Sequence, residues 1–292
     1  MSDQAGALAG STVAVVGLGL IGGSLVRALA RLPGGPRVRG ASPDAGDRGG
    51  AEREAGVLVT ANAAEAVADA DIVIYAAPLG AILDLLPAHA PLFKPGALVT
   101  DVAGLKRPLL DLAARIGIGD RFVGSHPLAG GEGSGFAEGR ADLFRGARVF
   151  LCAHADAGPT LPARAEALWR AVGSEPEWMS ADDHDRLMVR VSHLPQLVAN
   201  ALALALDDEG VGAAEMGPGG RDMTRLARSG PRMWADLLAH TGPDAAALLR
   251  EVGGWIEELA ERLEAGDGAA VSDLMARTRA WRAATLDAET RA

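Results

Sequence analysis

A glycine-rich turn between an apolar run and a helical pattern constrains the fold of this chain more than any other feature. The run 13–16 is apolar and rich in β-branched residues, as in a buried strand. It leads into Gly17-Leu-Gly-Leu-Ile-Gly22 and then into an apolar repeat typical of a helix. In this strand–turn–helix context a G-x-G-x-x-G sequence indicates a dinucleotide-binding turn. Gly17 permits the sharp turn, Gly19 lets a pyrophosphate approach the backbone, and Gly22 lets the helix pack close to the strand.

Strands alternate with helical patterns over the first half of the chain. Further apolar runs predict strands at residues 37–41, 57–59, 71–76, 97–100 and 122–124. The alternation predicts an α/β fold with a doubly wound parallel sheet of the Rossmann type. Ligands of such sheets bind beyond the carboxyl ends of the strands. Three turns qualify on that ground: Ala77-Pro78-Leu79, residues 101–106 and residues 125–135.

The pattern changes after about residue 155, where the strands are expected to stop and long helical patterns take over. We predict a dinucleotide-binding domain over residues 1–155 and an all-α substrate and dimerisation domain over 156–292. Helices are expected at 162–172, 181–206 with a kink at Pro195, 221–228, 231–239, 243–263 and 269–286. Their apolar content exceeds what one core needs, which favours a helical homodimer.

Composition narrows the functional classes. The 292 residues carry a formal net charge of −10, and no basic stretch stands out, which argues against nucleic acid or an anionic membrane as a partner. No uninterrupted apolar run reaches the ~18–20 residues of a spanning helix, and the first residues do not resemble a secretory signal. Cys152 is the only cysteine, so neither a disulfide nor a cysteine-based metal site is expected. We expect a cytoplasmic protein.

The ribose end of the nucleotide site departs from the usual pattern. An acidic residue about 20 positions after the third glycine commonly holds the ribose 2′-hydroxyl, and here that position is Ser42. A neutral Ser42 does not repel a 2′-phosphate, and Arg39 or Arg48 can pair with one. Asp44, two positions further on, can equally restore the hydroxyl contact. The residues therefore leave NAD and NADP both open.

Two stretches carry candidate chemistry. The loop 124–135 follows a strand and places His126 in the first turn, where a neutral imidazole is a good general base. Glu132 in the same loop is a polar gate, a substrate contact or a solvated acid. In the helical half, His193 next to Pro195 is either a ligand contact or a packing residue. Further on, Arg221, Asp222 and Arg225 are close in sequence, and they form either a solvated basic face or a carboxylate site, since arginine can bind a carboxylate in bidentate fashion.

Seven motifs occur in order between about residues 10 and 285: GLGLIGGSL, DIVIYAAP, TDVAGLK, GSHPLAGGEGSGF, ADLFRGA, HDRLMVRVSHLPQ and GGRDMTRLARSGPRMW. Together they resemble the prephenate/arogenate dehydrogenase family, whose enzymes make the tyrosine precursor. The resemblance implies an N-terminal nucleotide domain, a C-terminal helical dimerisation domain and a site between them. It implies NAD or NADP as cofactor and no metal.

The resemblance assigns roles residue by residue. His126 matches the family's catalytic histidine, and Arg225 matches the arginine that grips a substrate carboxylate. Glu132 and Asp222 match acids near the mouth of the site. His193 matches the first histidine of the family's SHLPH motif, whose second histidine is Gln196 here. The nucleotide site is expected to comprise Gly17, Gly19, Leu20, Ile21, Gly22, Ser42, Ala77 and Pro78.

A second departure is Gly104, which stands where the family commonly has a serine that hydrogen-bonds near the catalytic histidine. That partner of His126 is therefore missing, or Ser125 or a water replaces it. The resemblance implies oxidative decarboxylation of prephenate to 4-hydroxyphenylpyruvate. The alternatives are an arogenate or 4-amino-4-deoxyprephenate dehydrogenase, or another Rossmann dehydrogenase that acts on a hydroxy acid.

Overall fold

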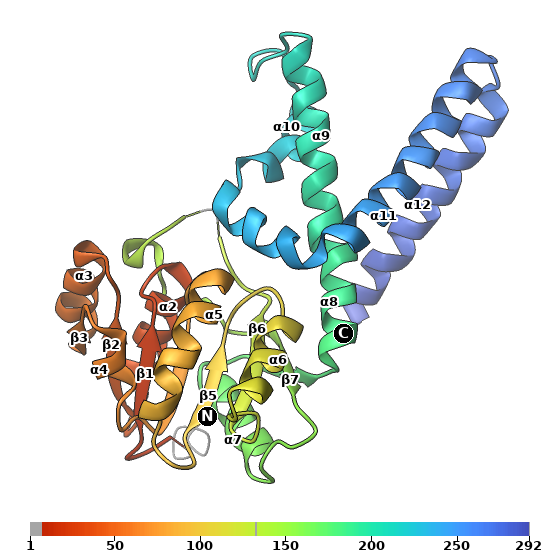
Figure 1. Ribbon diagram of the computed structural model, residues 1–292. Coiled ribbons are helices and arrows are strands. Elements are labelled where there is room, and N and C mark those ends of the chain that lie inside the picture. Colours follow the sequence, from red (N-terminus) through yellow and green to blue (C-terminus); the bar gives the residue numbers. More distant parts are fainter. Residues whose placement is uncertain (1–7, 132, 292) are drawn as a thin grey trace.

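The computed structural model describes residues 8–131 and 133–291, and it contains an eight-stranded sheet followed by a helical region (Figure 1). The strand order is β3-β2-β1-β4-β5-β6-β7-β8. Its first six positions follow the doubly wound nucleotide-binding order, so the predicted Rossmann-type sheet is confirmed. The strands are β1 (Thr12–Val16), β2 (Arg37–Ala41), β3 (Leu58–Thr60), β4 (Ile72–Tyr75), β5 (Leu98–Asp101), β6 (Phe122–Pro127), β7 (Arg148–Ala153) and β8 (Glu175–Trp178).

Helices cover both faces of the sheet. One apolar core lies under α2 (Leu20–Ala30), α3 (Ala45–Ala55) and α7 (Leu161–Ala171). The other lies under α4 (Ala63–Val67), α5 (Leu79–His89) and α6 (Arg107–Arg115). Short 3-10 turns are η1 (Ala90–Leu92) and η2 (Phe136–Glu138). Strands β1 and β4 are buried along their whole lengths, as their continuous apolar sequences require in a sheet covered on both sides.

The expectation that strands stop after residue 155 is wrong. Strand β7 pairs antiparallel with β6, and β8 then pairs parallel with β7. Helix α7, which was assigned to the all-α half, packs against β5, β6 and β7. Strand β8 has the sequence EPEW and is largely exposed at the edge of the sheet, so its composition carries no hydrophobic strand signal. The helical region accordingly begins after Trp178.

The helical region contains α8 (Ala181–Met188), a π-turn η3 (Val189–His193), α9 (Leu194–Asp208), α10 (Pro218–Thr224), a 3-10 turn η4 (Arg225–Arg228), α11 (Pro231–Glu264) and α12 (Gly268–Arg291). The expected kink at Pro195 takes the form of the π-turn that precedes it. The expected pair of helices at 231–239 and 243–263 is a single helix that continues through Pro243. Thr241 and Ala245 are buried on either side of this proline, so packing holds the helix across the lost hydrogen bond.

Helices α11 and α12 form a long hairpin that projects away from the sheet, and α9 projects beside it (Figure 1). Among the described residues, one helical segment, Ala181–Asp208, is long and apolar enough to cross a membrane by length and composition alone. Interior helices of soluble proteins pass the same test, and here α10 and η4 pack on this segment.

Candidate active site

The glycine turn fits a dinucleotide. Gly17 has a φ of 97°, and a Cβ there would lie 2.3 Å from the Ala76 carbonyl oxygen. A Cβ on Gly22 would lie 1.8 Å from the Gly17 carbonyl oxygen, so both positions require glycine. A Cβ on Gly19 would meet no atom within 4 Å. Gly19 also precedes α2 without a side-chain cap, and the uncapped N–H groups of the first turn suit a pyrophosphate.

The remaining residues predicted for the nucleotide surround this turn. Leu20 and Ile21 form the first turn of α2 and are partly exposed. Ala77 and Pro78 follow β4, the strand beside β1, so they lie at the same edge of the sheet. Their positions are those expected for contacts to a nucleotide that crosses the carboxyl ends of the strands.

Two glycine substitutions separate the architecture of this turn from its function. Gly19→Ala is expected to raise the Kd for the nucleotide roughly tenfold and to leave the free energy of unfolding unchanged, because its Cβ enters open space. Gly22→Ala is expected to destabilise the fold by about 1–3 kcal/mol, because its Cβ collides with backbone. Nucleotide titration and urea unfolding of both variants test this. Equal effects of the two variants on stability would contradict it.

Ser42 is buried directly after β2, at the position expected for the ribose contact. The Asp44 N–H donates to the Ser42 hydroxyl at 3.2 Å, and the Asp44 carboxylate caps α3 by accepting from the Asp47 N–H. Arg48 donates to the carbonyl oxygens of Ser42 and Pro43. Arg39 instead donates to the Ala68 carbonyl oxygen, at 3.1 Å.

His126 is the penultimate residue of β6. The strand is longer than predicted, so His126 lies at its end and not in the turn that follows it. It therefore lies at the carboxyl edge of the parallel strands, the edge that also carries the glycine turn. Its side chain is partly exposed, and its Nδ1 lies 2.9 Å from Nε2 of His184. Burial of the ring, and then the positive charge of Lys106 and the neighbouring His184 and His193, hold the pKa of His126 well below its usual range. At neutral pH the ring is an uncharged base.

The alternative in which Ser125 orients His126 is wrong. The Ser125 hydroxyl bonds to Thr100 Oγ1 at 2.7 Å and accepts from Trp169 Nε1 at 3.0 Å. Successive side chains of a strand point to opposite faces, so Ser125 faces the α7 side while His126 faces away from it. A serine at position 104 would fit, because the nearest atom to a Cβ on Gly104 is a Leu237 methyl group at 3.5 Å.

A buried ion pair between Lys106 and Asp101 contacts the backbone of β6. Lys106 and Asp101 are fully buried and paired, and Lys106 Nζ also donates to the Ser125 carbonyl oxygen at 2.6 Å. The Asp101 carboxylate further accepts from the N–H groups of Ala103 and Ser125. Burial raises the pKa of Asp101, and these donors, with Lys106 foremost, oppose the rise. The pair ties the end of β5 to the strand that carries His126.

His184 and Asp185 are site residues that the sequence reasoning missed. His184 is fully buried on α8 and packs on His126 and Phe150, whose rings both meet it edge-on. Its Nδ1 lies 2.7 Å from the Asp185 carboxylate. The sequence HDR next to the SHLP stretch is the only signal, and it does not name its partner, since His126 is 58 residues away.

His193 and Gln196 lie on the neighbouring π-turn and α9. Nδ1 of His193 bonds to Thr241 Oγ1 of α11 at 3.0 Å, and Trp234 meets the ring edge-on. Burial lowers the pKa of His193. Gln196 Nε2 donates to the Leu226 carbonyl oxygen at 2.7 Å, and its Oε1 accepts from Ser229. Gln196 thereby fastens the segment that follows α10 against α9.

The other predicted substrate residues are placed less centrally. Arg225 begins η4 next to Leu226 and is exposed. Asp222 is exposed on α10. Glu132 lies outside the described residues.

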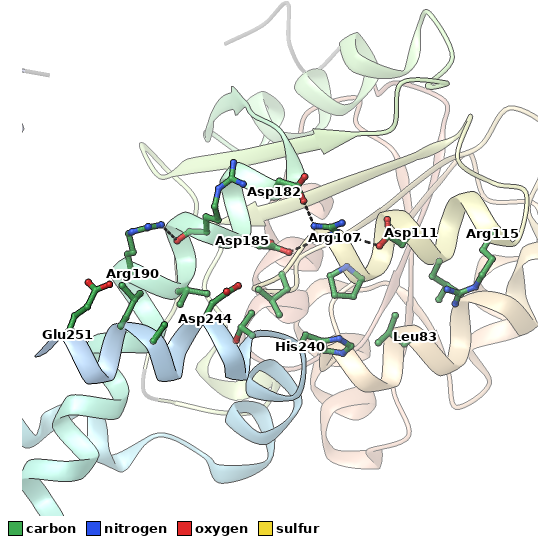
Figure 2. A pocket seen from close by; sticks show the side chains of 18 residues that line it. Leu83, Arg107, Asp111, Arg115, Asp182, Asp185, Arg190, His240, Asp244 and Glu251 are labelled. Atoms are coloured by element: carbon green, nitrogen blue, oxygen red, sulfur yellow. Dashed lines mark hydrogen bonds and ion pairs between the residues drawn. The ribbon is translucent and has the colours of Figure 1, made fainter. Parts of the chain in front are cut away.

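A cavity of about 810 Å³ lies between α6, α8 and α11 (Figure 2). Asp185 and Thr241, the partners of His184 and His193, both line it. Arg107 crosses its wall and pairs with Asp182 at 2.7 Å and with Asp111 at 3.8 Å. The cavity therefore reaches the hydrogen-bond partners of two site histidines from the helical side.

Comparisons with known proteins agree with a nucleotide-binding sheet followed by a helical region. The model of the family described as "Prephenate dehydrogenase, nucleotide-binding domain" matches residues 27–176, and "Prephenate dehydrogenase, dimerization domain" matches residues 180–277. The boundary between the two matches coincides with the end of β8. The first match begins inside α2, so the glycine turn itself rests on the geometry given above.

Two curated relatives and a solved structure cover most of the chain. Cyclohexadienyl dehydrogenase of Zymomonas mobilis is 30% identical over 88% of this chain and 89% of its own length. Prephenate dehydrogenase of Bacillus subtilis is 30% identical over 85% of this chain and 68% of its own length. The crystal structure of prephenate dehydrogenase from A. aeolicus in complex with hydroxyphenyl propionate and NAD+ has a TM-score of 0.85 and 26% identity. It covers 94% of this chain and 98% of that one. The resemblance seen in the motifs is confirmed, and this chain belongs to the prephenate dehydrogenase family of nicotinamide-dependent oxidoreductases.

Proposed function

We propose that this chain catalyses the oxidative decarboxylation of prephenate to 4-hydroxyphenylpyruvate with NAD or NADP, in tyrosine biosynthesis. The observation that carries the proposal is His126, an uncharged and partly exposed base at the sheet edge that bears the glycine turn. Family membership supplies the substrate class. A cytoplasmic location fits a biosynthetic enzyme of this kind.

The proposed mechanism needs one base. The substrate is a cyclohexadienol with a ring carboxylate. When bound, the oxidised nicotinamide supplies a hydride acceptor for the carbon that carries the hydroxyl. His126 accepts the hydroxyl proton at Nε2, because its Nδ1 is engaged by His184. Charge therefore need not accumulate on the oxygen as the ring carboxylate leaves as carbon dioxide and the ring becomes aromatic.

We assign the carboxylate grip to Arg225. Gln196 supports this assignment, because it fastens the backbone of Leu226, the next residue, to α9 one turn from His193. Guanidinium groups bind carboxylates in bidentate geometry, which fixes orientation as well as affinity. Asp222 and Glu132 are proposed to lie at the mouth of the site, and His193 and Gln196 along its helical wall.

The proposed activity can be tested by nicotinamide reduction with four pairs of substrate and cofactor. Purified protein is mixed with prephenate or arogenate and with NAD or NADP, and nicotinamide reduction is followed by absorbance. We expect turnover with prephenate, and the ratio of kcat/KM values identifies the preferred side chain and cofactor. Turnover with arogenate alone would favour the amino-acid alternative. Nucleotide binding without turnover in all four pairings would contradict the proposal.

Ser42 is expected to decide how well a 2′-phosphate is accepted. Ser42→Asp places a carboxylate at the end of β2 and should lower kcat/KM with NADP by about 10–100-fold, because like charges in contact cost several kcal/mol. The value with NAD should change little. Ser42→Asn is the control, because asparagine has a size similar to that of aspartate and carries no charge. The ratio of the two kcat/KM values is measured in each variant, and equal losses with both nucleotides would contradict the assignment.

The pH dependence follows from the lowered pKa of His126. The reaction needs the unprotonated ring, so activity falls as pH drops through the pKa of His126. Because burial and Lys106 depress that pKa below 6.5, kcat/KM is expected to stay level through pH 6.5 and to fall only at more acidic pH. A profile of kcat/KM against pH measures this. A half-maximal value above pH 6.5 that is lost in His126→Asn would contradict it.

We further propose a homodimer formed through the C-terminal helices. Large apolar side chains are exposed along the parts of α9, α11 and α12 that project from the sheet: Leu204, Trp255, Ile256, Leu263, Met275 and Trp281. The match to the family's dimerisation domain supports a second copy of the chain as the partner that covers them. Light scattering is expected to give twice the chain mass, and a monomer at micromolar concentration would contradict the proposal.

A further inference from the structure

The side chains of His184 and Asp185 are connected to His126 by consecutive hydrogen bonds. The reaction proposed above assigns neither of them a role. Nδ1 of His126 lies 2.9 Å from Nε2 of His184, and Nδ1 of His184 lies 2.7 Å from Oδ1 of Asp185. His184 is fully buried, and Phe150, the register partner of His126 on β7, also meets its ring edge-on. These hydrogen bonds thus connect the base of the site to a carboxylate on α8.

Two backbone N–H groups that donate to Asp185 indicate which atom donates in each hydrogen bond between Asp185 and His126. Asp185 accepts the N–H groups of Lys106 and Arg107, at 2.8 and 3.0 Å, at the first turn of α6. An ionised carboxylate only accepts hydrogen bonds, so Nδ1 of His184 must donate to it. A neutral imidazole with Nδ1–H presents an acceptor at Nε2. Nε2 of His184 therefore accepts, and Nδ1 of His126 donates.

The Asp185 end of these hydrogen bonds reaches the cavity. The Asp185 side chain is 14% exposed and lines the cavity between α6, α8 and α11, whereas His184 is fully buried (Figure 2). The carboxylate also lies at the N-terminal end of α6, where the helix dipole favours negative charge.

We propose that Asp185 and His184 form a relay that holds His126 in its Nδ1–H tautomer and takes up the positive charge when His126 accepts a proton. The Nδ1–H tautomer leaves a lone pair on Nε2 of His126, the atom that must face the substrate hydroxyl. The uptake of positive charge during the reaction rests on the proposed function. His184 and Asp185 are positioning residues in this scheme, since they act through His126.

The proton balance is simple. The substrate O–H bond breaks, and its proton binds Nε2 of His126. The proton on Nδ1 of His126 passes to Nε2 of His184, which becomes an imidazolium beside the Asp185 carboxylate. The charge is thereby moved away from Lys106, whose ammonium disfavours a cation on His126, and placed next to an anion. After product leaves, the two transfers run backwards and Nε2 of His126 releases the proton to water.

The tautomer can be measured without turnover. The chain has six histidines, so nitrogen-15 spectra of histidine-labelled protein, in the presence of NAD, resolve each ring. We expect His126 as the Nδ1–H tautomer in the native protein and as the Nε2–H tautomer in His184→Ala. His89→Ala removes another buried histidine, whose partner is Tyr75, and should leave His126 unchanged. An Nε2–H tautomer in the native protein, or no change in His184→Ala, would overturn the relay.

Kinetics test whether His184 and Asp185 take up the positive charge during the reaction. His184→Ala is expected to lower kcat for prephenate by about 10²–10⁴-fold with little change in KM, as for loss of a base's orienting partner. Added imidazole should restore part of kcat, more for imidazoles of higher pKa, and should not affect His89→Ala. If His184→Ala does not fold, Asp185→Asn is measured in the same two ways. An unchanged kcat in a protein that turns over prephenate overturns the relay and leaves the function standing. A native protein without turnover removes the function, and the spectra still decide the tautomer.

Discussion

His126→Asn is expected to lower kcat by about 10²–10⁴-fold, the range typical for loss of a general base. Asparagine keeps a polar side chain of similar size at the end of β6, but it cannot accept a proton. The Kd for the nucleotide should change little, because the glycine turn follows β1 and Ser42 follows β2, whereas His126 lies on β6. Steady-state kinetics and nucleotide titration of the purified variant measure both quantities.

A matched control is His154→Asn, which changes an exposed histidine beyond β7 whose partner is Asp156. It should retain the kcat of the native protein. An His126→Asn variant that keeps its kcat, or that loses nucleotide affinity in parallel with kcat, would remove His126 from the role of base.

Lys106→Met is expected to cost about 3–5 kcal/mol of folding free energy, because it leaves the Asp101 carboxylate buried without its counter-ion. The other lysine of the chain, Lys94, pairs with Asp71 at the surface, where its own side chain is 48% exposed. Lys94→Met should cost no more than about 1 kcal/mol. Urea unfolding of both variants gives the comparison.

The double variant Asp101→Asn with Lys106→Met removes both charges and should recover part of the loss, since no buried charge is then left unpaired. Equal costs for Lys106→Met and Lys94→Met would contradict the importance of the buried pair. A double variant less stable than Lys106→Met would contradict the explanation by an unpaired charge.

The sheet could be predicted from sequence wherever local pattern and burial coincide. Strands β1 and β4 are apolar runs buried on both faces, and the spacing of Gly17 and Gly22 indicates a close backbone contact that the structure bears out. Strand β8 was missed because it lies exposed at the sheet edge and consists of Glu-Pro-Glu-Trp. Pro243 was overread as a helix end, because buried packing around it outweighs one missing hydrogen bond.

The site divides in the same way. His126 could be found because a histidine after a strand is visible in the sequence, whereas none of the alternatives open for its hydrogen-bond partner, Ser125 among them, was the residue that the structure places there. The actual partner, His184, reaches it from α8, 58 residues later. Such a contact depends on how the helical region packs on β6 and β7, which no local pattern encodes. The carboxylate of Asp185 likewise binds the start of α6, 79 residues earlier along the chain.

One measurement tests the central claim most directly: carbon dioxide release and nicotinamide reduction followed together in a single turnover of prephenate. The account predicts one carbon dioxide for each nicotinamide reduced, at the same rate, in the native protein. Both signals should slow together in His126→Asn. Reduction without carbon dioxide, or carbon dioxide without reduction, would contradict the assignment of this chain as an oxidative decarboxylase that uses His126 as its base.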